Sequence, residues 1–362
     1  MVVCVLLGVG LQSPAQDFSV EGNNNQYTIT GYFGSGGVVN IPGTIYDGLP
    51  FAGTITGITD YAFSAQYSPD VITSITIPST VTSIGNRIFY TCTALTNVVI
   101  VSGTNAATGM GYEAFGECFN LATVDLGNSL TNISDYMFNY CSSLGNIIIP
   151  NSVQTIGEAA FFQCTGLTNL TIGTNVIDIG LDAFSYCGGL TNVTIPLSVT
   201  NIEGGAFYQC AGLSSVTIPN RVLSIGGNAF YSCAGLTNLT IGTNVTGIGE
   251  YAFHSCSRLT SLVIPQSVIS IGMDAFYSCT GLTSITIGDH VTSIGNWAFA
   301  YCSPTTITIP GSVSNIGDFA LAGMYNMKSI YFTGNAPVLG ASVFSGDTAT
   351  VYYLPGTTGW SN

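Results

Sequence analysis

Apolar and polar positions recur along this chain with a fixed period. Nine phenylalanines mark it at equal intervals: Phe115, Phe138, Phe161, Phe184, Phe207, Phe230, Phe253, Phe276 and Phe299. Phe63 and Phe89 precede this series at slightly longer intervals, and Leu321 and Phe344 follow it. Residues 58–345 therefore predict an array of thirteen modules, in which each module is one supersecondary unit stacked on its neighbours.

The pattern inside a module predicts its local structure. In the module at residues 167–189, Leu170 and Ile172 alternate with polar residues and predict a short strand. The residues that follow at helical spacing predict a short helical turn facing inward: Ala183, Phe184 and Cys187. One module cannot bury its apolar face alone, so neighbours must stack at the strand spacing of about 4.8 Å. The expected fold class is a repeat solenoid, a leucine-rich-repeat type of right-handed stack of short parallel β-strands with short helical turns.

Three irregularities interrupt the period. Three extra residues fall within residues 64–70 and three more within residues 102–108, and one residue is missing between Cys302 and Ile309. We expect these places to be bulges or pinches in loops that leave the stack intact.

The two ends of the chain differ from the array. Residues 2–11 form an apolar run too short to span a bilayer, and small residues follow it, so residues 1–15 predict a secretory signal peptide. A buried N-terminal strand is the alternative. Residues 18–57 lack the Ala-Phe-x-x-Cys element and predict a β-rich N-terminal cap. Residues 346–362 predict an incomplete C-terminal end.

The repeated unit carries a resemblance to a known family. The pattern I-P-x-x-V-x-x-I-G-x-x-A-F-x-x-C-x-x-L resembles the BspA-like subclass of bacterial leucine-rich repeats, with clear instances at Ile218 to Leu236 and Ile264 to Leu282. The resemblance covers about residues 58–345. It implies a surface-exposed or secreted bacterial protein, of a kind that includes proteins resembling adhesins for host or matrix proteins. It implies no catalytic residues.

Composition excludes several classes of partner. Charged residues make up 6% of the chain, and 4 basic residues against 18 acidic ones give a net charge of −14. A nucleic-acid binder needs a basic footprint, which this chain lacks, and an anionic membrane surface would repel it. Because 46% of the residues are hydrophobic, a core can still form. The polar surface must come from Thr, Ser, Asn and Gly, as in the outward strand positions Thr171, Thr194, Thr217, Thr240, Thr286 and Thr308.

Ten cysteines recur three residues after the anchor position, one in each module from Cys92 to Cys302. Disulfides are one interpretation. Each bridge would have to join neighbouring coils, and coils that fan apart on the outer side of a curved stack would exceed the roughly 7 Å limit for Cα separation. We therefore expect reduced, buried thiols that act as small apolar side chains. No C-x-x-C pair suggests a metal site, and no cofactor is expected.

Acidic or amide residues often follow the Ile-Gly turn: Asp60, Asn86, Asp135, Glu158, Glu250, Asn296 and Asp318. A calcium ladder is one interpretation, but calcium needs several oxygens converging on one point. We favour capping residues ahead of the short helical turn. His254 and His290 are the two histidines, and neither sits at a break in the repeat that could hold a catalytic site. The chain is not expected to be an enzyme.

Aromatic residues also recur directly after the anchor. In four consecutive modules they are Tyr208, Tyr231, His254 and Tyr277. Half-buried packing between adjacent turns is one interpretation. The other is a ligand-binding stripe, in which ring faces contact a partner and the adjoining small or polar residues let it approach: Gln209, Ser232, Ser255 and Ser278.

The sequence therefore favours a non-catalytic adhesion or recognition protein, extracellular or on the bacterial cell surface. It would bind an unidentified protein or polysaccharide through the solenoid surface, at these four rings. The alternative is a structural spacer or surface-layer module without a specific ligand.

Overall fold

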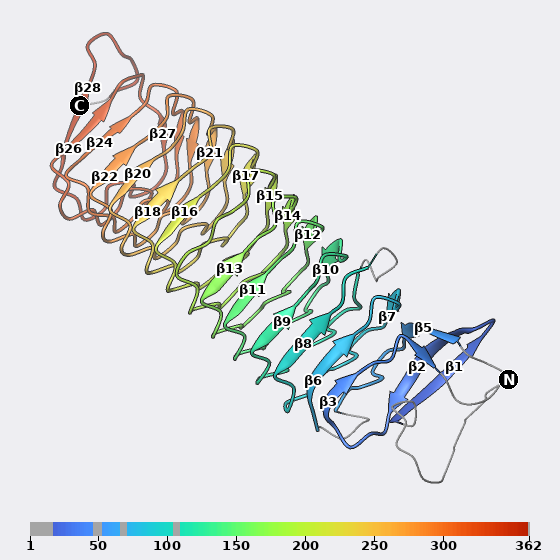
Figure 1. Cartoon of the computed structure of the whole chain (residues 1–362). Helices are drawn as coiled ribbons and strands as arrows, with labels where there is room; N and C mark the ends of the chain where they lie inside the picture. The colour runs from blue at the N-terminus through green and yellow to red at the C-terminus, as the bar shows by residue number, and fades with distance from the viewer. Residues whose placement is uncertain (1–16, 46–52, 66–70, 104–108, 361–362) are drawn as a thin grey trace. The chain divides into compact units, whose positions relative to one another are not determined.

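A computed structural model describes residues 17–45, 53–65, 71–103 and 109–360. It contains two compact units, Met1–Val176 and Ile177–Asn362. Within each unit the chain winds in coils that are joined by parallel strands (Figure 1). The predicted signal peptide lies outside the described residues.

Unit 1 begins with a hairpin and continues with coils. Its strands are β1 (Phe18–Asn23), β2 (Gln26–Tyr32), β3 (Gly37–Asn40), β4 (Thr44–Ile45), β5 (Gly53–Ile58), β6 (Ile72–Ile77), β7 (Ser83–Ile84), β8 (Asn97–Ile100), β9 (Thr123–Asp125), β10 (Asn132–Ile133), β11 (Asn146–Ile148), β12 (Thr155–Ile156) and β13 (Asn169–Thr171). Strands β1 and β2 pair antiparallel, as do β4 and β5. Strand β2 pairs with β5 in parallel, and the parallel sheet β3-β6-β8-β9 follows the coils.

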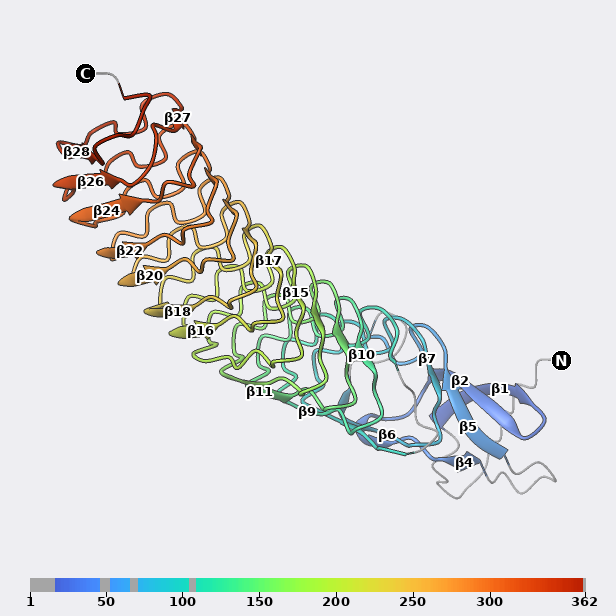
Figure 2. The ribbon, with the colours of Figure 1, turned by 90° about the horizontal axis from the view of Figure 1, so that it is seen from above.

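Unit 2 consists of coils only. Its strands are β14 (Asp178–Ile179), β15 (Asn201–Ile202), β16 (Ser215–Thr217), β17 (Ser224–Ile225), β18 (Asn238–Thr240), β19 (Gly247–Ile248), β20 (Ser261–Val263), β21 (Ser270–Ile271), β22 (Ser284–Thr286), β23 (Ser293–Ile294), β24 (Thr306–Ile309), β25 (Asn315–Ile316), β26 (Ser329–Phe332), β27 (Val338–Leu339) and β28 (Thr350–Tyr353). The two-residue strands such as β15 and β17 form one row, and the longer strands from β16 to β28 form a second row across the coil (Figure 2).

The irregularities of the period leave the parallel pairing in place, as expected. Where extra residues occur, β5 still pairs with β7 through Gly57 and Ser83, and β8 still pairs with β9 through Asn97 and Thr123. At the later pinch, where a residue is missing, β23 still pairs in parallel with β25, just as β21 pairs with β23 in the regular part. The flanking strands therefore stay in register, while residues 66–70 and 104–108, where most of the extra residues fall, lie outside the described residues.

The phenylalanine anchors form the core, which confirms the prediction. In unit 2, the rings of Phe184, Phe207, Phe230, Phe253, Phe276 and Phe299 are fully buried. Neighbouring rings stack with centroids 5.2–5.4 Å apart and planes within 12° of parallel. The rings between the first and the last therefore bury both faces against equivalent rings in adjacent coils.

The predicted short helical turn is wrong. No α-helix occurs among the described residues, because two residues around each anchor from Phe89 onward take left-handed backbone angles that end a helix. Around Phe184 these are Asp182, with φ 53°, and Tyr186, with φ 62°. The segment is a ladder of turns instead. The N–H of Phe184 donates to the carbonyl of Ala206 in the next coil at 2.8 Å, and the N–H of Cys187 donates back to Phe184 at 3.2 Å.

Hydroxyl groups also link the coils. At one bend, the hydroxyl of Thr237 donates to the carbonyl of Ser214 at 3.0 Å. At another bend, Thr246 donates to the carbonyl of Leu223 at 3.0 Å. Threonine and serine at these places satisfy backbone carbonyls of the preceding coil without charge. This explains how the chain folds with so few charged residues.

Candidate functional site

The turn ladder positions the four rings singled out by the sequence. Each of these residues directly follows a phenylalanine anchor, and its backbone is bonded on both sides. The N–H of Tyr208 donates to Gly205 in the same coil at 2.8 Å, and its carbonyl accepts from Tyr186 in the preceding coil at 2.7 Å. Equivalent bonds recur at Tyr231 and His254. Side chains at this position consequently line up along the coils of unit 2.

The structure brings the four rings into one stack, which we call the aromatic column: Tyr208, Tyr231, His254 and Tyr277. Centroids are 4.8 Å apart between Tyr208 and Tyr231, 4.5 Å between Tyr231 and His254, and 4.8 Å between His254 and Tyr277. The interplanar angles are 11°, 11° and 15°. All four side chains are half-buried.

This packing changes how a partner could contact the column. Tyr231 and His254 each have a stacked ring on both sides, so neighbours in the column occupy their faces. The expectation that ring faces would contact a ligand is therefore wrong for these two residues. A partner would meet ring edges and polar ring atoms instead, where an aromatic ring is electropositive at its rim.

Aromatic rings continue beyond both ends of the column, but they come from the next residue of the module. Ser185 and Ala300 stand where the column would have its next rings, and the following residues, Tyr186 and Tyr301, supply them. Tyr186 lies 5.3 Å from Tyr208, tilted by 59°. Tyr301 lies 5.3 Å from Tyr277 at 74°, edge to face. In these two coils the small residue comes first and the tyrosine second, so every coil here still contributes one ring. Packing between coils could favour this arrangement as well as binding.

Polar groups beside the column are short and uncharged. Gln209, Ser232, Ser255 and Ser278 are half-buried and share the left-handed backbone, with φ between 52° and 59°. The Oγ of Ser255 lies 2.9 Å from Nδ1 of His254. Burial lowers the pKa of His254. At neutral pH the column therefore presents a neutral imidazole among phenols.

One carboxyl group lies buried close to the column. Asp274 is 9% exposed and bonded to Tyr251, whose ring centroid is 5.9 Å from that of His254. Burial raises the pKa of Asp274 above its ordinary value and raises that of Tyr251 as well. The carbonyl of Asp274 accepts the N–H of Tyr277 at 3.1 Å, so this residue belongs to the scaffold of the column.

Sequence reasoning missed a charged cluster in unit 1. Nε of Arg87 lies 2.7 Å from Oε2 of Glu113, and its Nη1 donates to the hydroxyl of Tyr61 at 2.9 Å. The guanidinium also lies over the rings of Tyr90 and Tyr112, at 5.3 Å and 5.4 Å. Burial raises the pKa of Tyr90 to about 12. The scarcity of basic residues was the available signal, since an arginine inside an otherwise uncharged repeat needs partners.

The cysteine prediction is confirmed in unit 2, for a different reason. Cys210, Cys233, Cys256, Cys279 and Cys302 are unbridged and buried. Neighbouring coils do not fan apart here, since the rings of Phe184 and Phe207 are 5.3 Å apart. Instead each thiol donates to the carbonyl of the anchor one coil earlier, as Cys210 does to Phe184 at 3.1 Å. Burial raises the pKa of Cys210 well above its ordinary value.

The row of acidic and amide residues after the Ile-Gly turn also joins coils. Asp135 accepts the N–H of Glu158 at 2.8 Å, and Asn296 accepts that of Asp318 at 2.9 Å. These side chains bond to the next coil instead of capping a helix in their own coil. No group of three or more His, Cys, Asp or Glu residues that could hold a metal ion occurs in the described part of the chain. Nor does that part contain a helix long and apolar enough to cross a membrane.

The repeats match a known family model, and the fold is similar to solved structures. The family model for the BspA type leucine rich repeat region matches in six copies, over residues 56–191, 177–269 and 246–358. A leucine-rich repeat protein from Bacteroides ovatus superposes with a TM-score of 0.65 at 22% identity, covering 93% of this chain and 98% of that one. A leucine rich cell surface protein from Faecalibacterium prausnitzii gives 0.54 at 26% identity, with 93% of both chains covered. No curated protein matches.

Proposed function

Because the chain belongs to the family of BspA-type leucine-rich repeat proteins, we propose that it is a non-catalytic recognition protein of the bacterial cell surface or extracellular space. It binds a protein or polysaccharide through the surface of the solenoid, and the aromatic column is its contact site. The similar structure from Faecalibacterium prausnitzii, described as a cell surface protein, supports the location.

The observation that carries this proposal is the regular stacking of the column. Its four rings lie within 15° of parallel between neighbours, and their backbones are hydrogen-bonded on both sides. A contact surface that is already ordered loses little side-chain entropy on binding. Tyrosine is enriched at binding hot spots for this reason and because it offers both an apolar ring and a hydroxyl.

The chemistry of the column defines the partner. The column offers ring edges, phenol hydroxyls and one imidazole, and serines adjoin it. These groups donate and accept hydrogen bonds without carrying charge at neutral pH. A partner rich in amide or hydroxyl groups fits them, and binding would respond weakly to salt because no ion pair is involved.

The test replaces Tyr208 and Tyr231 together, in two forms. Tyr208→Ala/Tyr231→Ala removes rings and hydroxyls and should weaken binding to a captured matrix protein or glycan by about 2 kcal/mol or more. Tyr208→Phe/Tyr231→Phe keeps the stack and removes only the hydroxyls. Binding would be measured by pull-down and by surface plasmon resonance against immobilised matrix proteins and glycans.

A matched control exists in the same unit. Tyr331 of β26 and Tyr352 of β28 also stack, 5.0 Å apart at 15°, and both are exposed on the strand face. Tyr331→Ala/Tyr352→Ala should leave the affinity unchanged. Equal losses in both double variants, or unchanged affinity in a folded column variant, would contradict the column as the site.

A structural spacer is the second candidate, and one observation favours it. The faces of Tyr231 and His254 are used inside the column, and the column changes position so that a ring is kept in each coil. Packing between coils would by itself produce the occupied ring faces and the ring in each coil. Under this alternative the column variants lose stability, and no matrix protein or glycan binds the unchanged chain.

A further inference from the structure

One acidic residue stands where the repeat has its thiols. Cysteine occupies the third place after the anchor in ten consecutive modules, and the two modules that follow have Met324 and Asp347 there. The cysteines at this place are buried between coils, and so is Met324. Asp347 therefore brings an ionisable carboxyl group to a position that the other coils fill with a neutral side chain.

The carboxyl group of Asp347 joins its own coil to the preceding one. In the regular coils the N–H of the residue at this place donates to its own anchor, as Cys302 does to Phe299 at 3.2 Å. The N–H of Met324 donates to Oδ1 of Asp347 in the following coil, at 2.7 Å. One oxygen of the carboxyl group is thus fixed against the backbone of the neighbouring coil.

The other oxygen of this carboxyl group, Oδ2, is buried from solvent and has no hydrogen-bond partner in the described part of the chain. Thiols at the same place donate to the carbonyl of the anchor one coil earlier, as Cys302 does to Phe276 at 3.3 Å. The corresponding carbonyl for Asp347 is that of Leu321. A carbonyl only accepts, so a protonated Oδ2 can bond to it and an ionised Oδ2 cannot.

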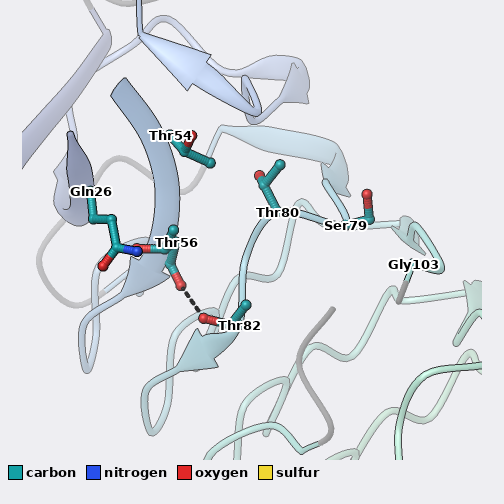
Figure 3. Close-up of a pocket in the computed structure, with 7 residues that line it drawn as sticks. All are labelled: Gln26, Thr54, Thr56, Ser79, Thr80, Thr82 and Gly103. Carbon is teal, nitrogen blue, oxygen red and sulfur yellow. Dashed lines mark hydrogen bonds between the residues drawn. The ribbon is translucent and has the colours of Figure 1, made fainter. Parts of the chain in front are cut away.

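Asp347 differs from the other buried polar groups that lack a partner within the described residues. Those groups are the side-chain oxygens of Thr80, Asn139, Ser152 and Ser185, which are hydroxyls and an amide. Thr80 belongs to the lining of a hollow in unit 1 whose residues are all uncharged (Figure 3). A change of pH near neutrality leaves hydroxyls and amides unaltered, whereas it can change the charge of Asp347.

No opposite charge compensates an ionised Asp347 in the described structure. Lys328 in the preceding coil is exposed and forms no ion pair with it, and Asp318 of that coil accepts the N–H of Ala341 at 2.6 Å. The remaining titratable groups of the two coils are tyrosines, which stay neutral below about pH 9: Tyr325, Tyr331, Tyr352 and Tyr353. Burial raises the pKa of Asp347 to about 6, although the N–H of Met324 acts to lower it.

We infer that Asp347 forms a proton-dependent contact between two coils of unit 2. When the carboxyl group is protonated, Oδ2 donates to the carbonyl of Leu321 and continues the ladder that the thiols form in the other coils. When the proton passes to water, this bond is lost and a negative charge is left buried, so β28 separates from β26 more often. The inference does not depend on the aromatic column or on its partner.

The contact is therefore strongest in acid. With the coils separated, the carboxyl group has its ordinary pKa of 3.8, and with the coils in contact its pKa is about 6. The stability that the proton contributes is fully present below the lower value and is lost as the pH rises through the higher one. Separation should accordingly be about tenfold more frequent at about pH 7.5 than at about pH 5.

Hydrogen exchange followed by mass spectrometry on the full chain tests this, with rates corrected for the intrinsic pH dependence of exchange. In the unchanged chain the amides of β28 should be about tenfold less protected at about pH 7.5 than at about pH 5. Asp347→Asn places an N–H donor beside the carbonyl of Leu321 at every pH. It should keep at pH 7.5 the protection that the unchanged chain has at pH 5. Asp347→Cys restores the residue of the repeat and should also remove the pH dependence.

Asp318→Asn is the matched control, because Asp318 also joins these two coils and Asn296 fills the same place one coil earlier. This variant should keep the tenfold difference, and β16 of the same unit serves as the reference for changes that affect the whole chain. Circular dichroism shows whether each variant is folded, and Asp347→Cys decides if Asp347→Asn is not. Equal protection of β28 at both pH values in the unchanged chain, or a tenfold difference that persists without Asp347, would overturn the inference.

Discussion

His254 replaces a tyrosine in the middle of the aromatic column, and this one exchange makes the column sensitive to pH. Its ring lies between Tyr231 and Tyr277, 4.5 Å and 4.8 Å away. Desolvation there opposes a positive charge, whereas the faces of two phenol rings would attract one. Burial prevails, since the pKa of His254 is lowered.

The first prediction follows from that lowered pKa. The unfolded chain takes up a proton on His254 near pH 6.5, before the folded chain does, so stability falls as the pH drops through this value and the loss is complete below the folded pKa. Between about pH 7.5 and 5.5, the unchanged chain should lose more unfolding free energy than His254→Phe, as measured by denaturant titration.

Asp274 contributes with the opposite sign. Its folded pKa is raised by burial, so its contribution to stability falls as the pH rises, and comparison with His254→Phe separates the two effects because both proteins keep Asp274. An NMR titration that placed the pKa of His254 at or above about 6.5 would show that the flanking tyrosines outweigh desolvation.

A second prediction at this scale concerns the thiols. Cys210 is buried and bonded to Phe184, and its raised pKa leaves almost no thiolate, which is the reactive form. Iodoacetamide should label Cys210 and Cys233 slowly in the native chain and rapidly after denaturation. Mass spectrometry of the unreduced protein provides the check, and a Cys210–Cys233 bridge would contradict the structure.

At the scale of the element, the turn ladder depends on left-handed residues. Most of these residues are not glycine, as with Asp182 and Tyr186. Their residue types therefore did not indicate a left-handed backbone, and the sequence predicted a helical turn. Gly205 is an exception, with φ 63°. The spacing of apolar residues predicted which side chains face inward. It could not predict the backbone that carries them, because Ala-Phe-x-x-Cys has the same inward pattern in a helix and in this ladder.

The third prediction tests the ladder at that glycine. A Cβ on Gly205 would lie 2.1 Å from Oδ1 of Asp182, and the backbone there is left-handed. Gly205→Ala should therefore destabilise the chain by about 1 kcal/mol or more. Gly188 is the matched control, because a Cβ there meets nothing within 4 Å. Gly188→Ala should be neutral or slightly stabilising in thermal denaturation, and equal losses would argue against a strained ladder.

At the scale of the whole molecule, equivalent positions bond to equivalent positions. Phenylalanine stacks on phenylalanine, thiols bond to the previous anchor, and threonines bond to the previous bend. Within the described residues one salt bridge is found, between Arg87 and Glu113. The sequence predicted the solenoid because the same apolar pattern recurs in every coil. The column's position was predictable for the same reason, but the orientation of its rings depends on packing between coils.

The fourth prediction concerns how many coils are destabilised when one phenylalanine anchor is removed. Phe230 stacks on Phe207 and Phe253 at 5.2 Å on each side, so Phe230→Ala leaves a cavity that should cost about 3–5 kcal/mol. Hydrogen exchange should accelerate in the coils next to Phe230 and stay unchanged in the strands of unit 1, since each coil contacts only its neighbours. Uniform loss of protection along the chain would show global cooperativity.

The repetition of contacts also bears on how such a chain changes over generations. A crossover between two copies of the repeat within the gene would delete or add one whole module, and the coils at the junction would meet surfaces like those they had before. Ring spacing of 5.2 Å between Phe207 and Phe230 means that each such event shortens or lengthens the stack by about that distance. The number of coils can therefore change by whole modules without a new interface having to evolve. Related proteins selected for different solenoid lengths would differ by whole coils.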